Sequence, residues 1–92
     1  MPQERLEFAL EGVRPNPSLG GELTVEFTLP TAAPARLEVL DVRGRRVAEE
    51  TLTAAGRHSV TIGRGSHLGP GIYVIRLSQG TNIRTARAAV LR

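Results

Sequence analysis

Cysteine, tryptophan and lysine are absent from this chain of 92 residues. Without cysteine, the chain can form neither a disulfide framework nor a metal site with thiolate ligands. No apolar run is long enough to cross a membrane as a helix. The first residues also lack the apolar core of a signal peptide, so we expect either a cytoplasmic protein or a piece of a longer exported chain.

Aromatic residues are scarce as well, because the chain has only Phe8, Phe27 and Tyr73. Surfaces that bind single-stranded nucleic acid stack bases on exposed aromatic side chains beside basic patches. All three aromatic residues fall at positions that we assign to the core. The basic run at residues 43–46 is therefore interpreted as a solvated turn, and we expect no nucleic-acid partner. Three residues also cannot make the row of exposed aromatics that binds sugars.

What the chain does contain is alternation of apolar and polar residues with a period of two, which is typical of half-buried strands. Turn residues separate these stretches, and no stretch has the apolar spacing of a helix. The predicted strands are residues 6–11, 22–29, 35–42, 45–53, 57–62, 72–78 and 82–91. The length is that of one domain. We therefore predict an all-β fold, a seven-stranded antiparallel immunoglobulin-like β-sandwich with Greek-key connections.

The register of these strands follows from the residues that are costly to bury. Alternate residues from Leu23 to Leu29 are apolar and are predicted to face the core. The apolar residues Leu40 and Val42 break the alternation of their strand, which predicts coverage on both faces at that end, and a bulge is expected near residues 48–50. In the last strand, Arg87 is assigned to the outer face. The residues then predicted to face inward are Ala86, Ala88 and Val90.

The strongest strand signal follows the sequence Leu68-Gly69-Pro70-Gly71-Ile72-Tyr73. This spacing predicts a tyrosine corner, in which the Tyr73 hydroxyl bonds a backbone group a few residues upstream while the ring packs into the core. Pro70 fixes φ, and Gly71 permits a backbone conformation that other residues resist. A tyrosine that stacks on a ligand is the alternative interpretation. The residues assigned to the corner are Leu68, Pro70, Gly71 and Tyr73.

Residues that could carry catalysis do not form a recognisable site. His58 and His67 have no third ligand at metal spacing, so we expect no metal. Most of the nine carboxylates fall at outward strand positions, and nothing marks two of them as a pair across a cleft. Asp41 precedes a hairpin turn at Gly44 and Arg45, where we expect it to accept hydrogen bonds from backbone amides. We therefore expect neither an enzyme nor a bound cofactor.

Several short motifs occur in a fixed order along almost the whole chain. They are Phe8-x-Leu10, Pro15-Asn16-Pro17, Leu37-x-Val39-x-Asp41-x-x-Gly44-Arg45-x-Val47, Gly56-x-His58, Leu68-x-x-Gly71-Ile72-Tyr73-x-x-Arg76-Leu77 and Thr85-x-Arg87-x-x-Val90-x-Arg92. This ordered set resembles the type A C-terminal sorting domain of the type IX (Por) secretion system. The resemblance covers about residues 6–92.

The resemblance implies a function that composition alone does not show. Domains of this family end large secreted proteins of the Bacteroidetes lineage and direct them through an outer-membrane type IX translocon. A sortase-like peptidase then removes the domain and attaches the cargo to the cell surface. By this resemblance, residues 6–92 are the sorting domain of a larger protein exported through the periplasm, and residues 1–5 are the remnant of a linker.

The last strand is the part that we expect the translocon to recognise, through addition of a strand to an exposed edge. The residues predicted to take part are Arg84, Arg87, Val90, Leu91 and Arg92. The alternative function is an accessory module of a secreted hydrolase, either an immunoglobulin-like or fibronectin-like spacer or a carbohydrate-binding module.

Overall fold

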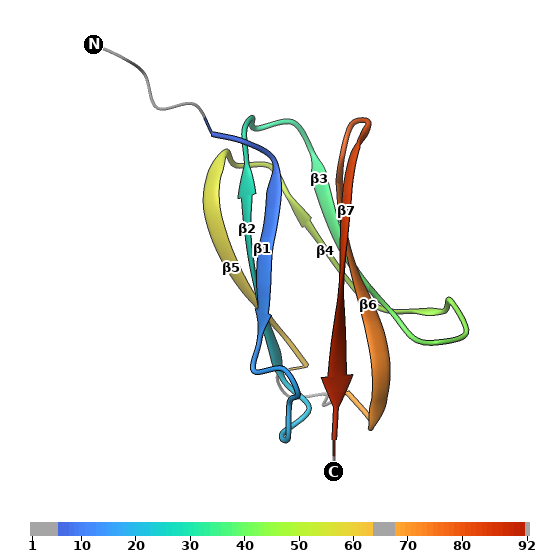
Figure 1. The fold of residues 1–92 in the computed structure, drawn as a ribbon. Coiled ribbons are helices and arrows are strands. Elements are labelled where there is room, and N and C mark those ends of the chain that lie inside the picture. Colours follow the sequence, from blue (N-terminus) through green and yellow to red (C-terminus); the bar gives the residue numbers. More distant parts are fainter. Residues whose placement is uncertain (1–5, 64–67, 92) are drawn as a thin grey trace.

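The computed structural model describes residues 6–63 and 68–91 of the chain. This part contains seven strands and no helix, which confirms the predicted all-β class (Figure 1). The described residues accordingly include no helix of the length and hydropathy needed to span a membrane. The strands are β1 (Ala9–Arg14), β2 (Leu23–Leu29), β3 (Ala35–Leu40), β4 (Arg46–Leu52), β5 (Gly56–Ile62), β6 (Gly71–Gln79) and β7 (Asn82–Val90).

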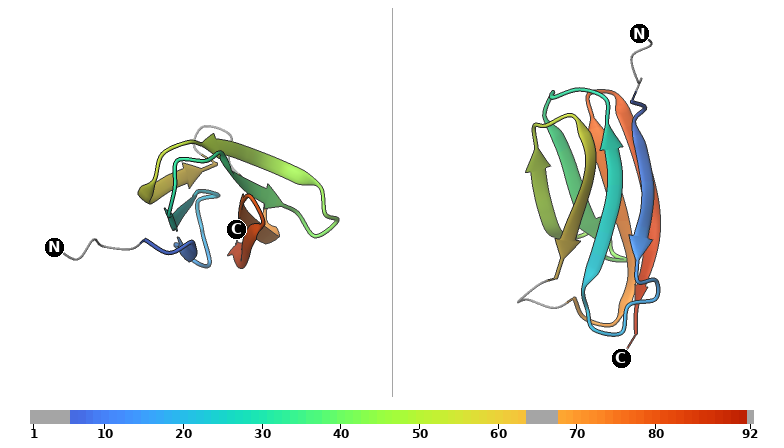
Figure 2. Two further views of the ribbon diagram at one scale, coloured as in Figure 1. Left: turned by 90° about the horizontal axis from the view of Figure 1, so that it is seen from above. Right: turned by 90° about the vertical axis from the view of Figure 1, so that its left-hand side faces the viewer.

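The strands form two antiparallel sheets that pack face to face (Figure 2). One sheet has the order β1-β2-β5, and the other has the order β4-β3-β6-β7. The chain makes a hairpin within a sheet at β1-β2, β3-β4 and β6-β7, and it changes sheet at the connections between them. The arrangement is a β-sandwich compatible with an immunoglobulin-like fold.

The core lies between the two sheets and consists of the alternate apolar residues of their inner faces. In β2, the residues at alternate positions from Leu23 to Leu29 are fully buried, as predicted. Leu37 and Val39 of β3 meet them from the other sheet, together with inward residues of β6 and β7. Phe27 is the largest fully buried side chain, and its ring stacks on His58 with a centroid separation of 5.2 Å.

The turn before β6 has the geometry of a tyrosine corner. The Tyr73 hydroxyl donates a hydrogen bond of 2.6 Å to the backbone carbonyl oxygen of Gly69, while the residue as a whole is 8% exposed. Leu68 is buried, and its backbone N–H donates to the carbonyl oxygen of Gly21 at 3.0 Å. Gly71 has a backbone φ of +152°, a value that residues other than glycine rarely adopt. The aromatic ring and the turn are thereby fixed to each other at the start of β6.

One strand boundary and the position of one bulge differ from the sequence prediction. The first strand was expected to end at residue 11, but a bulge between Leu10 and Gly12 lets β1 continue to Arg14 in register with β2. In β4 the extra residue is Val47, because Ala48 pairs with Val39 while Arg46 pairs with Leu40. This bulge lies just before the stretch in which we expected it.

The prediction that Val42 is covered was wrong. β3 ends at Leu40, and the Val42 side chain lies in the β3-β4 turn, where 76% of its surface is exposed. The hydrogen bonds of Asp41, described below, turn the chain before Val42 can join the strand.

Replacing Tyr73 with phenylalanine tests the corner. The ring would still fill its place in the core, but the Gly69 carbonyl oxygen would lose its donor. We expect a loss of about 1 kcal/mol or more in the free energy of unfolding, measured by urea denaturation. An unchanged denaturation midpoint, with the same dependence on urea, would contradict the proposed contribution of the hydroxyl.

Candidate recognition surface at the terminal strand

The terminal strand β7 forms one edge of the four-stranded sheet. It pairs with β6 along its whole length, from Gln79 opposite Asn82 to Gly71 opposite Val90. In an antiparallel pair, the backbone groups of every second residue point away from the partner strand. On β7 these are the odd-numbered residues, because Ala89 directs both its N–H and its carbonyl oxygen away from β6. This outer edge is where strand addition was expected.

A short segment of the chain, residues 16–18, covers the end of this edge, and we call it the strap. The Asn16 side chain donates from Nδ2 to the carbonyl oxygen of Arg87 at 3.1 Å and accepts at Oδ1 from the N–H of Ala89 at 3.0 Å. The Ser18 N–H donates to the carbonyl oxygen of Ala89, and the Ser18 carbonyl oxygen accepts from the N–H of Leu91, both at 2.8 Å. The strap therefore occupies the backbone groups that an added strand would need between Arg87 and Leu91.

The strap carries the N-terminal part of the chain from one sheet to the other. β1 pairs with β2 in the three-stranded sheet, whereas Ser18 bridges Val90 of the other sheet in a parallel arrangement. Ser18 is itself 1% exposed, and its hydroxyl donates to the carbonyl oxygen of Glu22 at 2.7 Å. From the sequence this stretch is expected to be a loop, because the turn residues around Asn16 give no sign of a partner in the last strand.

One of the residues predicted to bind the translocon, Val90, faces the interior of the sandwich, and a second, Arg84, contacts Phe8 while staying exposed. Val90 is 1% exposed and belongs to the core. Arg84 pairs with the buried Leu77, and its guanidinium lies over the Phe8 ring at 5.6 Å from the centroid. Its Nη1 also donates to the carbonyl oxygen of Ile83 at 2.9 Å. Because the Val90 side chain is buried in the core, we remove it from the candidate recognition residues, whereas the exposed Arg84 stays a prediction.

The other predicted residues of this strand lie on its outer face or at its end. Arg87 is exposed and pairs with Val74, whose side chain lies on the face opposite the core. Leu91 follows with the same alternation and is 49% exposed. Arg92 lies outside the described residues. Ala88, like Val90, is buried, in agreement with the predicted register.

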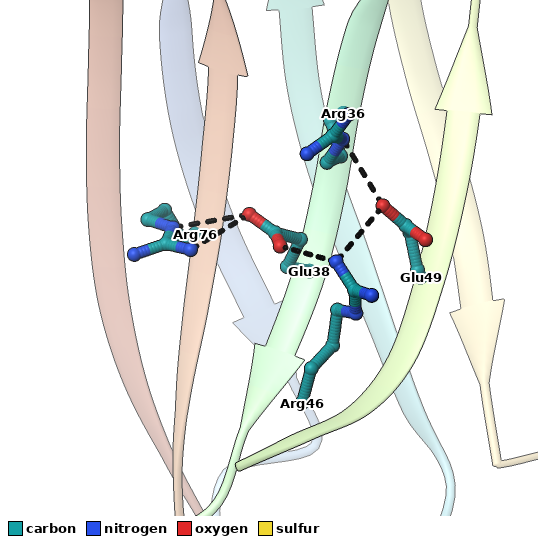
Figure 3. A network of polar contacts seen from close by, with 5 residues as sticks. All are labelled: Arg36, Glu38, Arg46, Glu49 and Arg76. Carbon is teal, nitrogen blue, oxygen red and sulfur yellow. Dashed lines mark hydrogen bonds and ion pairs between the residues drawn. The ribbon is translucent and has the colours of Figure 1, made fainter. Parts of the chain in front are cut away.

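An ion-pair network lies on the same outer face, centred on the carboxylate of Glu38 in β3 (Figure 3). Arg76 of β6 donates to Glu38 Oε1 from Nε at 3.1 Å and from Nη2 at 3.0 Å. Arg46 of β4 approaches Glu38 Oε2 at 3.3 Å and Glu49 at 3.4 Å, and Arg36 approaches Glu49 at 3.0 Å. The network thereby links three neighbouring strands.

The Glu38 side chain is only 6% exposed, so its charge depends on these partners. Burial alone would raise the pKa of Glu38. The hydrogen bonds from Arg76 and Arg46 and the nearby positive charges outweigh burial, so the pKa of Glu38 lies below its ordinary value. Glu38 is therefore held ionised within a nearly covered site.

The β3-β4 hairpin is organised by Asp41. One carboxylate oxygen accepts hydrogen bonds from the N–H groups of Arg43 and Arg45, both at 2.9 Å, and the other contacts Arg45 Nε at 3.1 Å. Gly44 takes a φ of +81° at the tip. The hydrogen bond from the Arg45 backbone is the largest influence on the carboxyl, and with the others it lowers the pKa of Asp41 although burial acts in the opposite direction. These contacts make Asp41 a turn residue.

Elsewhere, several side chains that could take part in catalysis or metal binding contact neighbouring residues. A shallow cavity of about 360 Å³ is lined by Glu11, Glu26, Arg57, His58 and Ser59. Glu11 accepts from Thr28 at 2.9 Å, and Glu26 pairs with Arg14 at 3.1 Å. His58 Nε2 contacts the carbonyl oxygen of Ala54 at 2.6 Å. No three His, Asp or Glu side chains gather in the described ranges, and His67 lies outside them.

Comparison with family models gives a match to the secretion system C-terminal sorting domain over residues 13–91. The matched part includes the strap, the hairpin, the tyrosine corner and β7, and it covers most of the chain. The chain belongs to this family. The resemblance to type IX sorting domains is thus confirmed, and the family is a class of sorting signals, not of enzymes. A search of curated proteins finds no match.

Replacing Asn16 with alanine tests the strap of this sorting domain. The substitution removes two hydrogen bonds to β7 at an edge that water can reach, so we expect a loss of about 1–2 kcal/mol in the free energy of unfolding. Asn82→Ala is the matched control, because the Asn82 side chain forms no hydrogen bond within the described residues. Equal stability losses for the two variants would contradict the assignment.

Replacing Glu38 with glutamine tests the ion-pair network. Because the pKa of Glu38 is lowered by folding, its charge stabilises the sorting domain above the ordinary glutamate range, and this contribution is lost as the pH falls through the folded pKa. We expect Glu38→Gln to be less stable near neutral pH and to lose less stability on acidification than the wild type. Urea denaturation across the pH range measures both effects.

Glu50→Gln is the control for this experiment, because Glu50 is exposed and forms no ion pair with a described residue. If Glu38→Gln and Glu50→Gln follow the same stability curve against pH, the network does not contribute as described.

Proposed function

We propose that residues 6–92 are the C-terminal sorting signal of a larger secreted protein, with residues 1–5 belonging to the linker. The signal directs the protein from the periplasm through the outer-membrane type IX translocon. A sortase-like peptidase then cuts in the linker, and the cargo is attached to the cell surface or released. The family match over residues 13–91 is the observation that carries this proposal.

The arrangement of the chain suits a signal placed at the end of a cargo protein. β1 begins at one end of the sandwich, and β7 finishes at the opposite end (Figure 1). A cargo joined ahead of β1 would therefore leave the terminal end of the sandwich accessible to a receptor. A folded sandwich can present such a surface in a fixed form, which an unfolded tail cannot.

Closure of the strand edge suits passage through the periplasm. An open edge strand can pair with other chains and lead to aggregation. The strap covers one end of the β7 edge, and the bulge at Val47 with the charged residues of β4 interrupts the edge on the other side of the same sheet. These features would keep the domain from pairing with other chains before it is exported.

The alternative of a sugar-binding module has little support in the described residues. Phe27 is fully buried, Tyr73 is 8% exposed, and Phe8 is partly covered by the Arg84 guanidinium. These three are the only aromatic residues of the chain, so they leave no exposed aromatic row of the kind that stacks on sugars. A spacer is the second candidate function. A measurement of export distinguishes it from a sorting signal, because a spacer would not direct a protein across the outer membrane.

A reporter fusion tests the function directly. We would join residues 1–92 to the C-terminus of a reporter that enters the periplasm by its own signal peptide, in a bacterium with a type IX system. We expect the reporter in the medium or on the cell surface of the wild type, and in the periplasm of a strain without the translocon. Periplasmic retention in both strains would favour the spacer and contradict the proposal.

A further inference from the structure

The outer face of β6 and β7 has an uncovered apolar area at its terminal end, and we call this area the terminal face. Ile72 and Leu91 are each 49% exposed, and Ala89 lies opposite Ile72 in the register. Next to it, Val74 lies between Leu40 of β3 and Arg87 of β7. The residues of the terminal face are Leu40, Ile72, Val74, Arg87, Ala89 and Leu91.

At this end of the sandwich the strap occupies the backbone groups of β7, so a partner would have to bind the side chains of the sheet. A partner strand that paired with β7 between Arg87 and Leu91 would have to displace four hydrogen bonds from Asn16 and Ser18. The side chains of the terminal face point away from the core, and those of Ile72 and Leu91 are each 49% exposed. A receptor that meets the folded domain here would therefore contact the face of the sheet before its edge.

The terminal face contains a hollow suited to a side chain. A cavity of about 240 Å³ is lined by Asn16, Ile72, Arg87, Ala88 and Ala89. The small side chain of Ala89 leaves this space, and Ile72 provides an apolar wall beside it. An aliphatic side chain of a partner could enter the hollow and bury its surface against Ile72, which is favourable because apolar area leaves water.

The charge of Arg87 indicates which group of the partner would lie beside that aliphatic side chain. On this face, Glu38 and Glu49 are already engaged by Arg36, Arg46 and Arg76. Arg87 forms no ion pair with a described residue, although it is exposed at the rim of the hollow. A guanidinium in this position binds a carboxylate well, because its planar group can donate two parallel hydrogen bonds.

We propose that the terminal face is the docking surface for an extended segment of the export machinery that carries a carboxylate next to an aliphatic side chain. The carboxylate pairs with Arg87, and the aliphatic side chain enters the hollow beside Ile72. This inference rests on the proposed sorting function, and it replaces strand addition at the end of β7 by contact with the face of the sheet.

Charge reversal in the reporter fusion tests the proposal. We expect Arg87→Glu to lower export of the fusion at least tenfold. Arg57→Glu is the matched control, because Arg57 is also an exposed strand arginine without an ion pair among the described residues, but it lies in β5 of the other sheet. Export of Arg57→Glu should stay within twofold of the wild type.

The outcomes separate the two proposals. If the unchanged fusion is not exported, the proposed function fails. If it is exported and Arg87→Glu is exported as well as Arg57→Glu, the sorting function stands and the docking surface is wrong. Thermal unfolding of the purified domains checks that Arg87→Glu is folded to the same extent as Arg57→Glu.

A photo-crosslinking residue at position 72 provides a measurement that does not depend on charge reversal. We expect it to capture a component of the export machinery in cells, whereas the same residue at the exposed position 59 of β5 should not. Capture from both positions, from neither, or only of a second copy of this chain from position 72 would overturn the proposal.

Discussion

The organisation of this domain depends on how the backbone N–H and carbonyl groups of its terminal strand find hydrogen-bond partners. β7 is an edge strand, so β6 can bond only one of its two sides. The strap supplies partners for the end of the other side, with the Asn16 side chain acting in place of a backbone peptide group and Ser18 adding two backbone bonds. The N-terminal part of the chain must cross from one sheet to the other to do this. The same crossing fixes the end of β7 and thereby the orientation of Arg87 and Leu91.

The outer face of the four-stranded sheet divides into two regions of different character. Around Glu38, arginine and glutamate side chains satisfy one another across β3, β4 and β6 (Figure 3). Such a network positions the strands, and the nearly covered carboxylate would be costly to leave without its partners. Toward the end of β7, this network is replaced by apolar side chains and by Arg87, which forms no ion pair with a described residue. The carboxylates of this face are thus paired at the end around Glu38, whereas the other end has an exposed apolar area beside Arg87.

The sequence allowed the fold to be predicted where local patterns decide the structure. Strand β2 was predicted with its register because a charged or hydroxyl residue alternates with each apolar one. The bulge after Leu10 was missed because Gly12 and the following prolines read as a loop, while pairing with β2 keeps the chain extended to Arg14. The Tyr73 hydrogen bond was foreseen because its acceptor lies only a few residues away. Family motifs added the sorting function, which no local pattern indicates.

The recognition site was harder to predict because it depends on contacts between distant parts of the chain. Nothing in the sequence indicates that the exposed Arg84 lies over Phe8, which comes from the opposite end of the chain. Val90 was named as a recognition residue, although its alternation with Ala88 already put it in the core. The strap could not be foreseen, because an asparagine between two prolines gives no information about which strand it will bond.

Amide hydrogen exchange tests the central role of the strap most directly. The N–H groups of Ala89 and Leu91 are bonded by the strap, whereas no hydrogen-bond acceptor faces the N–H groups of Ile83 and Thr85 on the same edge within the described residues. The account predicts slow exchange at Ala89 and Leu91, close to that of the core strands, and fast exchange at Ile83 and Thr85. Exchange at Ala89 and Leu91 as fast as at Thr85 would show that the edge is open and would contradict the account.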